Sequence, residues 1–271
     1  MSWKGLKGLL FRISGPNAYR ALHAAYFFFR MVYALRSPRF GAHFFGRDLV
    51  TFTGQLKPGD RVLDIGAFLG ASTVLFARAV GKKGQVLAFE PVHSHFLRRV
   101  LSPFGLSQVS LSPLALAAEN GMTEFLIPIH NGVPLYSQSG FTESYSTQKQ
   151  RPDYRFLKLP TTLIRLDDFL LQKGWVPESI AAVKIDVEGS EISVFAGGED
   201  FFRRFKGFLM CEFWFNQVPP EGWKWLQKQG YHCRYLNRNG TWMEANTEKD
   251  MVAICQGETY GNFFWEKRPD P

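Results

Sequence analysis

The chain has 271 residues, of which 45% are hydrophobic and 21% are charged, close to the averages for globular proteins. This composition excludes a disordered chain, and 25 glycines, 15 prolines and three cysteines exclude a collagen-like chain and a disulfide framework. The net charge is +8, and the few, widely spaced cysteines favour a cytoplasmic location. The length allows one large domain or two small ones.

Residues 1–56 are predicted to form a helical N-terminal extension, with amphipathic helices at about 3–12 and 17–36. The first fifty residues contain eight basic residues and one acidic residue, Asp48. The longest apolar stretch, Ala21 to Phe29, is far shorter than the roughly 20 residues that cross a bilayer. We therefore expect the extension to cap the main domain, with peripheral membrane contact as the alternative.

From residue 57 to 260 strands alternate with helices, a pattern typical of parallel βαβ units in an α/β domain. The predicted strands are 61–65, 85–90, 109–116, 181–187, 207–213, 231–236 and 251–255, and the predicted helices are 71–80, 95–100, 190–195 and 222–229. Residues 119–165 interrupt the alternation as an insertion. It holds a strand-like stretch at 123–127 and a polar stretch from Tyr136 to Arg155, which is typical of a binding loop, a lid or a disordered segment. Residues 261–271 are expected to form a C-terminal tail.

The turn after the first strand indicates a cofactor site. Asp64 lies near the end of that strand, and Gly66 and Gly70 allow the backbone to turn tightly and approach a ligand. Ligands of such sheets bind at the carboxyl ends of the strands, where Glu90 is placed to hold the hydroxyls of an adenosine ribose. The G-x-G-x-x-G pattern of pyrophosphate binding is absent, which favours S-adenosylmethionine; an ordinary tight turn is the alternative.

Four blocks of sequence resemble the FkbM-type methyltransferases: Val62 to Ala67, Val86 to Pro91, Thr161 to Leu170 and Val183 to Glu191. They occur in the family's order and cover roughly residues 60–215. The resemblance implies an enzyme that depends on S-adenosylmethionine, most often an O-methyltransferase of sugars, glycolipids or polyketides. It also implies a Rossmann-like sheet of seven mostly parallel strands.

The resemblance further implies how the cofactor is held. Its methionine end would lie against the Gly66 loop, its ribose against Glu90 and its adenine against Leu116. The complete set expected to bind it is Asp64, Gly66, Ala67, Phe68, Gly70, Ser72, Glu90, Pro91, Leu116, Ala117 and Asp186. Phe68 stands where the family usually has Asn, and Ala118 where it often has Asp. A methyltransferase-like binding domain without turnover is therefore an alternative.

An alcohol acceptor must lose a proton as the methyl group arrives, so a base is needed. Asp186 is the predicted catalytic base, oriented by Lys184 two residues earlier. Because residues of a strand alternate in direction, Glu188 is expected on the opposite face, bonded to backbone or to Lys184. Asp186, Glu188 and Glu212 could together bind Mg²⁺, but no linear ligand motif is present and no metal is predicted. The alternative is that both acids only brace the loop.

The tyrosines and hydroxyls between Tyr136 and Arg155 suit a sugar, which favours O-methylation of a saccharide, glycolipid or related small molecule. N-methylation and methylation of nucleic acid are the alternatives. Nucleic acid is disfavoured because residues 24–29 form an apolar block rather than a polar, aromatic-studded groove. The sequence does not indicate the oligomeric state.

Overall fold

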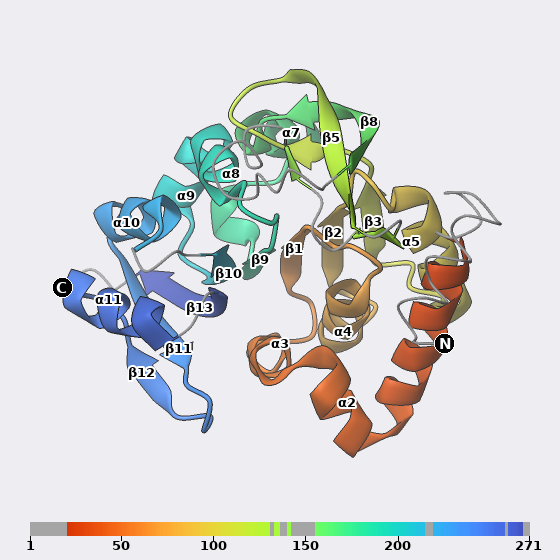
Figure 1. The fold of residues 1–271 in the computed structure, drawn as a ribbon, viewed down its shortest axis with the longest axis horizontal. Coiled ribbons are helices and arrows are strands. Elements are labelled where there is room, and N and C mark those ends of the chain that lie inside the picture. Colours follow the sequence, from red (N-terminus) through yellow and green to blue (C-terminus); the bar gives the residue numbers. More distant parts are fainter. Residues whose placement is uncertain are drawn as a thin grey trace.

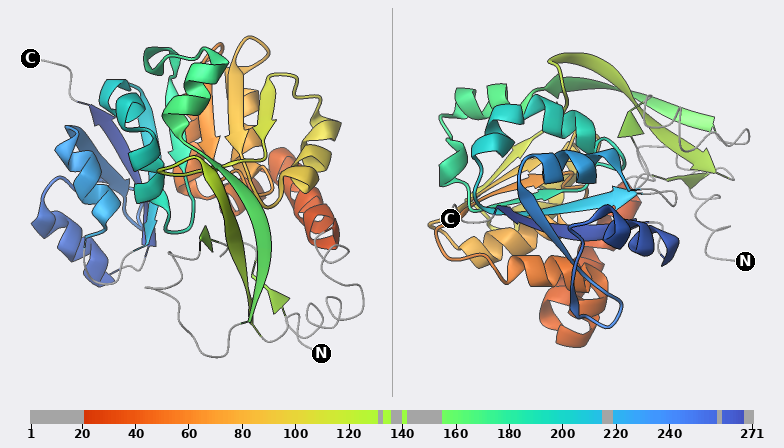
Figure 2. Two further views of the ribbon diagram at one scale, coloured as in Figure 1. Left: turned by 90° about the horizontal axis from the view of Figure 1, so that it is seen from above. Right: turned by 90° about the vertical axis from the view of Figure 1, so that its left-hand side faces the viewer.

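A large sheet with helices on both faces carries a smaller sheet at one end (Figures 1 and 2). This computed structural model describes residues 21–130, 133–135, 140–141, 155–214, 219–257 and 260–267. Buried aliphatic residues of the central strands and aromatic residues of the covering helices form the main core.

The large sheet has the strand order β12-β11-β13-β10-β9-β1-β2-β3. Its strands are β1 (Arg61–Ile65), β2 (Gln85–Phe89), β3 (Val109–Ser112), β9 (Ala182–Ile185), β10 (Phe208–Trp214), β11 (Tyr231–Leu236), β12 (Trp242–Glu244) and β13 (Tyr260–Lys267). The four pairings from β3 to β10 are parallel, and the remaining three are antiparallel. The predicted Rossmann-like, mostly parallel sheet is thus confirmed, but it has eight strands rather than seven, because β12 extends the edge beyond β11.

The helices are residues 21–36, α2 (Pro38–Phe45), α3 (Arg47–Thr53), α4 (Ala71–Val80), α5 (Ser94–Leu101), α7 (Leu166–Lys173), α8 (Glu191–Gly197), α9 (Glu199–Arg204), α10 (Glu221–Lys228) and α11 (Glu248–Gly257), with 3₁₀ turns η1 (Ser102–Phe104) and η3 (Pro177–Ser179). The helix at 21–36 agrees with the prediction for 17–36, whereas the predicted helix at 3–12 lies outside the described residues. Among the residues that the structure describes, no helix is long and apolar enough to span a bilayer.

The smaller sheet is built from the insertion. Its strands are β4 (Ala115–Leu116), β5 (Gly121–His130), β6 (Val133–Pro134), β7 (Gly140–Phe141) and β8 (Arg155–Ile164). β5 and β8 form a long antiparallel pair that projects from the large sheet (Figure 2). The polar stretch predicted from Tyr136 to Arg155 lies largely outside the described residues.

Two of the predicted strands are wrong. The strand expected at 109–116 is divided between the two sheets, as β3 and β4, on either side of Pro113, which has no N–H to donate to a ladder. The strand expected at 251–255 is part of helix α11, whose buried Met251 and Cys255 have the i, i+4 spacing of one helical face. The strand at that place is β13, in the segment expected to be a tail. Its Phe263, Phe264 and Trp265 are buried between β10 and β11.

Candidate active site

The loop between β1 and α4 lies directly on the end of β9. Gly66 has a φ of +81°, and a Cβ there would overlap the backbone oxygen of Asp186. The N–H groups of Gly66 and Ala67 both donate to the oxygen of Phe89, at 3.1 and 3.0 Å. Only glycine allows both this conformation and this approach, so the loop joins the carboxyl ends of three adjacent strands.

Asp64 holds this loop from beneath. Its side chain is fully buried and accepts hydrogen bonds from the hydroxyls of Ser72, at 2.8 Å, and Thr73, at 2.6 Å, in the first turn of α4. The Lys184 ammonium lies 3.7 Å from the Asp64 carboxylate and donates to the oxygen of Gly66 at 3.1 Å. The carboxylate of Asp64, the two hydroxyls and the ammonium of Lys184 therefore fix the position of the loop relative to β9.

Glu90, directly after β2, is held by backbone. Its Oε1 accepts the N–H groups of Val92, at 2.8 Å, and His93, at 2.7 Å, and its Oε2 accepts that of Phe68 at 2.8 Å. Because a carboxylate has about four lone-pair positions, roughly one remains for a hydroxyl of a ligand. These bonds fix the carboxylate at the wall of a pocket and tie the Phe68 loop to it.

A pocket of about 180 Å³, open to solvent on one side, lies above these loops. The residues that line it are Ile65, Gly66, Phe68, Phe89, Glu90, Pro91, Val92, His93, Leu114, Ala115, Leu116, Phe125, Asp186, Val187, Glu188 and Ser190. They come from the ends of β1, β2 and β9 and from the smaller sheet. The pocket therefore lies where the order of the parallel strands reverses.

The structure brings together six of the residues expected to bind the cofactor: Gly66, Phe68, Glu90, Pro91, Leu116 and Asp186. The other five, Asp64, Ala67, Gly70, Ser72 and Ala117, are buried around the pocket and do not line it. Phe125 of β5 was not expected, since no local pattern reveals that the insertion folds back over the pocket. Val92 could have been inferred, because it follows Glu90 closely.

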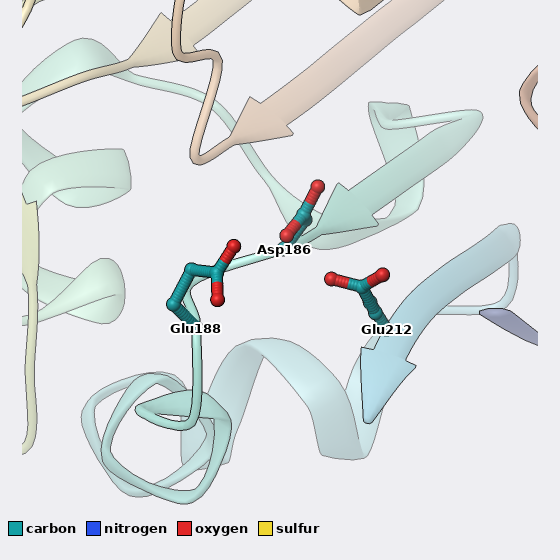
Figure 3. Close-up of side chains that lie close together, drawn as sticks. All are labelled: Asp186, Glu188 and Glu212. Carbon is teal, nitrogen blue, oxygen red and sulfur yellow. The ribbon is translucent and has the colours of Figure 1, made fainter. Parts of the chain in front are cut away.

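Three carboxylates meet at the ends of β9 and β10. Asp186, Glu188 and Glu212 each offer an oxygen within 4.8 Å of the others, and Figure 3 shows the three side chains pointing toward one another. The expected opposite orientation of Asp186 and Glu188 is wrong, because β9 ends at Ile185 and Glu188 has a φ of +55°, in the left-handed region.

The charges of this cluster are partly balanced within the protein. Burial raises the pKa of Glu212 to about 10, and repulsion by Asp186 and a hydrogen bond with it act in the same direction. Burial alone would lower the pKa of Lys184, but attraction by Asp186 and Asp64 outweighs it and the pKa is raised. Glu212 is thus protonated at neutral pH, and the Lys184 ammonium lies 3.3 Å from Asp186.

The same three carboxylates have the oxygen chemistry that a divalent cation prefers. The ammonium of Lys184 and the proton of Glu212 already reduce the negative charge that such an ion would need. Nearby, burial raises the pKa of Glu191 to about 7. A hydrogen bond from the N–H of Gly189, at 2.9 Å, lowers this pKa but does not outweigh the burial.

Phe68 connects the pocket to the N-terminal helix. It has a φ of +50°, which is strained for a bulky residue. Its ring lies 4.9 Å from that of His93, 6.0 Å from Phe27 and 6.4 Å from His23, measured between centroids. The helix at 21–36 therefore packs against a residue that lines the pocket.

The comparisons with known proteins agree with this geometry. The model of the methyltransferase FkbM domain matches residues 64–233, which is more than half of the chain. The chain belongs to the FkbM methyltransferase family. The comparison with curated proteins gives no match.

The chain also has a limited similarity to several solved structures. An FkbM methyltransferase from Methylobacillus flagellatus is 12% identical, with a TM-score of 0.44, over 92% of this chain and 60% of that one. A SAM-dependent O-methyltransferase from Thermotoga maritima is 16% identical, with a TM-score of 0.40, over 83% and 67%. An rRNA methylase from Streptococcus thermophilus is 13% identical, with a TM-score of 0.43, over 82% and 95%.

The family assigns this FkbM protein as a methyltransferase that uses S-adenosylmethionine. The residues of the pocket fit that cofactor. Pro91, Val92 and Leu116 offer an apolar wall for a base, and Glu90 retains acceptor capacity for a ribose hydroxyl. The Gly66 loop brings backbone, without a side chain, to the edge of the pocket.

Proposed function

We propose that this enzyme transfers the methyl group of S-adenosylmethionine to a hydroxyl of a saccharide, glycolipid or related small molecule. The observation that carries the proposal is the position of the Asp186 carboxylate. It lines the cofactor pocket at the end of β9, within a cluster of three carboxyl groups. Methyl transfer by in-line displacement depends mainly on alignment of the acceptor, the methyl group and the sulfur. A hydroxyl acceptor also requires a group at this place that takes its proton.

The neighbours of Asp186 suit a base. S-adenosylmethionine, when bound, supplies a methyl group on a sulfonium, which is already a good leaving group. Lys184 places its ammonium 3.3 Å from Oδ2 of Asp186 and, through Gly66, also holds the cofactor loop. Glu212, protonated at neutral pH, holds a proton beside Asp186 and orients its carboxylate by a hydrogen bond.

In this proposal Asp186 is the catalytic base, and Lys184 and Glu188 position it. Glu188 lines the same pocket and lies beside Asp186 because of its left-handed backbone. The hydroxyl of the acceptor would donate its proton to Asp186 as the new O–C bond forms. A cytoplasmic location fits the three cysteines, Cys211, Cys233 and Cys255, which are buried free thiols.

The test is transfer of an isotopically labelled methyl group to a panel of hydroxylated and amino acceptors. We expect label on a hydroxyl compound, and Asp186→Asn should lower the rate of transfer about 10²–10⁴-fold. Calorimetric binding of S-adenosylmethionine should persist in this variant. Asp200→Asn, the same change on the surface of α9, is the matched control and should leave the rate unchanged.

The proposal has clear contrary outcomes. Full activity of Asp186→Asn would show that another group takes the proton. Label on amines alone would establish N-methylation instead. Saturable cofactor binding with no label on any acceptor would favour the binding domain without turnover.

A further inference from the structure

The helix at residues 21–36 presents an apolar stripe to solvent. Leu22, Tyr26, Phe29 and Tyr33 lie at positions i, i+4, i+7 and i+11, which places them on one helical face. Their side chains are 51, 45, 69 and 59% exposed. The opposite face of the helix is anchored, because Ala24, Met31 and Ala34 are buried. The orientation of the stripe is therefore fixed by the core.

An apolar groove continues this stripe. It runs between the helix and α5, which lie side by side in Figures 1 and 2, and Ala25 and Phe28 of the helix line it. Phe96 and Pro103 form the other wall, and Arg99 lies beside them. The stripe and the groove together form one surface, which we call the N-terminal face.

The two segments that form this face carry positive charge only. Residues 21–47 contain four arginines and no Asp or Glu, and residues 91–118 contain two arginines and no Asp or Glu. Arg36, Arg39 and Arg99 are exposed. Exposed apolar side chains flanked only by cations are complementary to a surface that is negative outside and apolar beneath.

We propose that the N-terminal face docks onto a bilayer that contains anionic lipids. Leu22 and Phe29 would enter the boundary between headgroups and acyl chains, and Tyr33 would lie at headgroup level, where tyrosine combines an apolar ring with a polar tip. The arginines would contact anionic headgroups. The proposal goes beyond the methyl transfer reaction and does not depend on the identity of the acceptor.

Other partners fit this face less well. A second copy of the chain, docked through the same face, would bring together two surfaces whose segments carry arginines and no acid. A nucleic acid would engage the arginines but would place phosphates against Leu22 and Phe29. A bilayer engages both the charges and the apolar side chains.

The test is co-flotation of the full chain with vesicles of phosphatidylcholine, alone or with about one third phosphatidylglycerol. We expect binding to the anionic vesicles only, weakened by salt. Leu22→Ser/Phe29→Ser should weaken it about tenfold or more. Leu171→Ser/Val176→Ser changes two apolar residues elsewhere that are 81 and 51% exposed and should have no effect.

A second pair of variants tests the charges. Arg36→Gln/Arg39→Gln should weaken binding about tenfold, and Lys82→Gln/Lys83→Gln, which removes the same charge from the turn after α4, should change it far less. Unchanged thermal unfolding of every variant keeps the comparison valid.

Three results would overturn the proposal. The first is the absence of binding to anionic vesicles. The second is vesicle binding that Leu22→Ser/Phe29→Ser leaves intact. The third is a concentration-dependent dimer, or salt-dependent RNA binding, that the variants of this face abolish while vesicles are not bound.

Discussion

Glu212→Gln should stabilise the protein, although it alters a residue beside the active site. Glu212 takes up its proton near pH 4.5 in the unfolded chain, and its pKa is about 10 in the folded protein. The folded state therefore holds one more proton between these values, so that the free energy of unfolding falls as pH rises through this window. Each pH unit costs about 1.4 kcal/mol, which amounts to up to about 3 kcal/mol at pH 7.

Glutamine does not titrate, so it removes this pH-dependent loss of the free energy of unfolding. Its amide still donates a hydrogen bond to Asp186. Urea unfolding at pH values from about 5 to about 8 measures the effect. The variant should equal the wild type at the acidic end, exceed it increasingly toward neutral pH, and show a flatter pH profile. Glu191, whose pKa is raised to about 7, contributes to both proteins, so the difference between them isolates Glu212.

Glu119→Gln makes the same chemical change at an exposed position and should leave the profile unchanged. Parallel pH profiles of Glu212→Gln and the wild type would refute the reasoning. They would mean that Glu212 is ionised in the folded protein at neutral pH and that another cation balances the cluster.

Three further outcomes are expected. Gly66→Ala should destabilise the fold by more than about 3 kcal/mol in urea unfolding, since its Cβ would overlap the backbone oxygen of Asp186 at a φ of +81°. Glu90→Gln should weaken S-adenosylmethionine binding at least about tenfold by calorimetry, because its amide would face backbone N–H groups. Chelation with EDTA should leave methyl transfer within about twofold, since the Lys184 ammonium and the proton of Glu212 already balance part of the charge of the carboxylates; full loss restored by Mg²⁺ would contradict this.

The part of the pocket at the ends of β1 and β2 was predictable because its signals are local. The strand Arg61–Ile65, the glycine at 66 and the acid at 90 follow one another along βαβ units, whose handedness and strand order are strongly constrained. Parallel strands place their carboxyl ends together, so three short motifs suffice to predict one site.

What could not be predicted depends on contacts between distant segments or on unusual backbone angles. The strand pattern placed Asp186 and Glu188 on opposite faces, and one positive φ, at Glu188, brings them together. Apolar periodicity does not distinguish a short buried strand from a helix, which explains the error at 251–255. Nothing local to Phe125 indicates that the insertion covers the pocket.

Phe68 links the N-terminal helix to the pocket. Asn tolerates a left-handed backbone better than Phe does, and Phe at this position costs on the order of 1–3 kcal/mol. The contacts that offset this strain come from Phe27 and His23 of the N-terminal helix and from His93, while its N–H is held by Glu90. The N-terminal helix thus supplies part of the packing around a residue that lines the pocket.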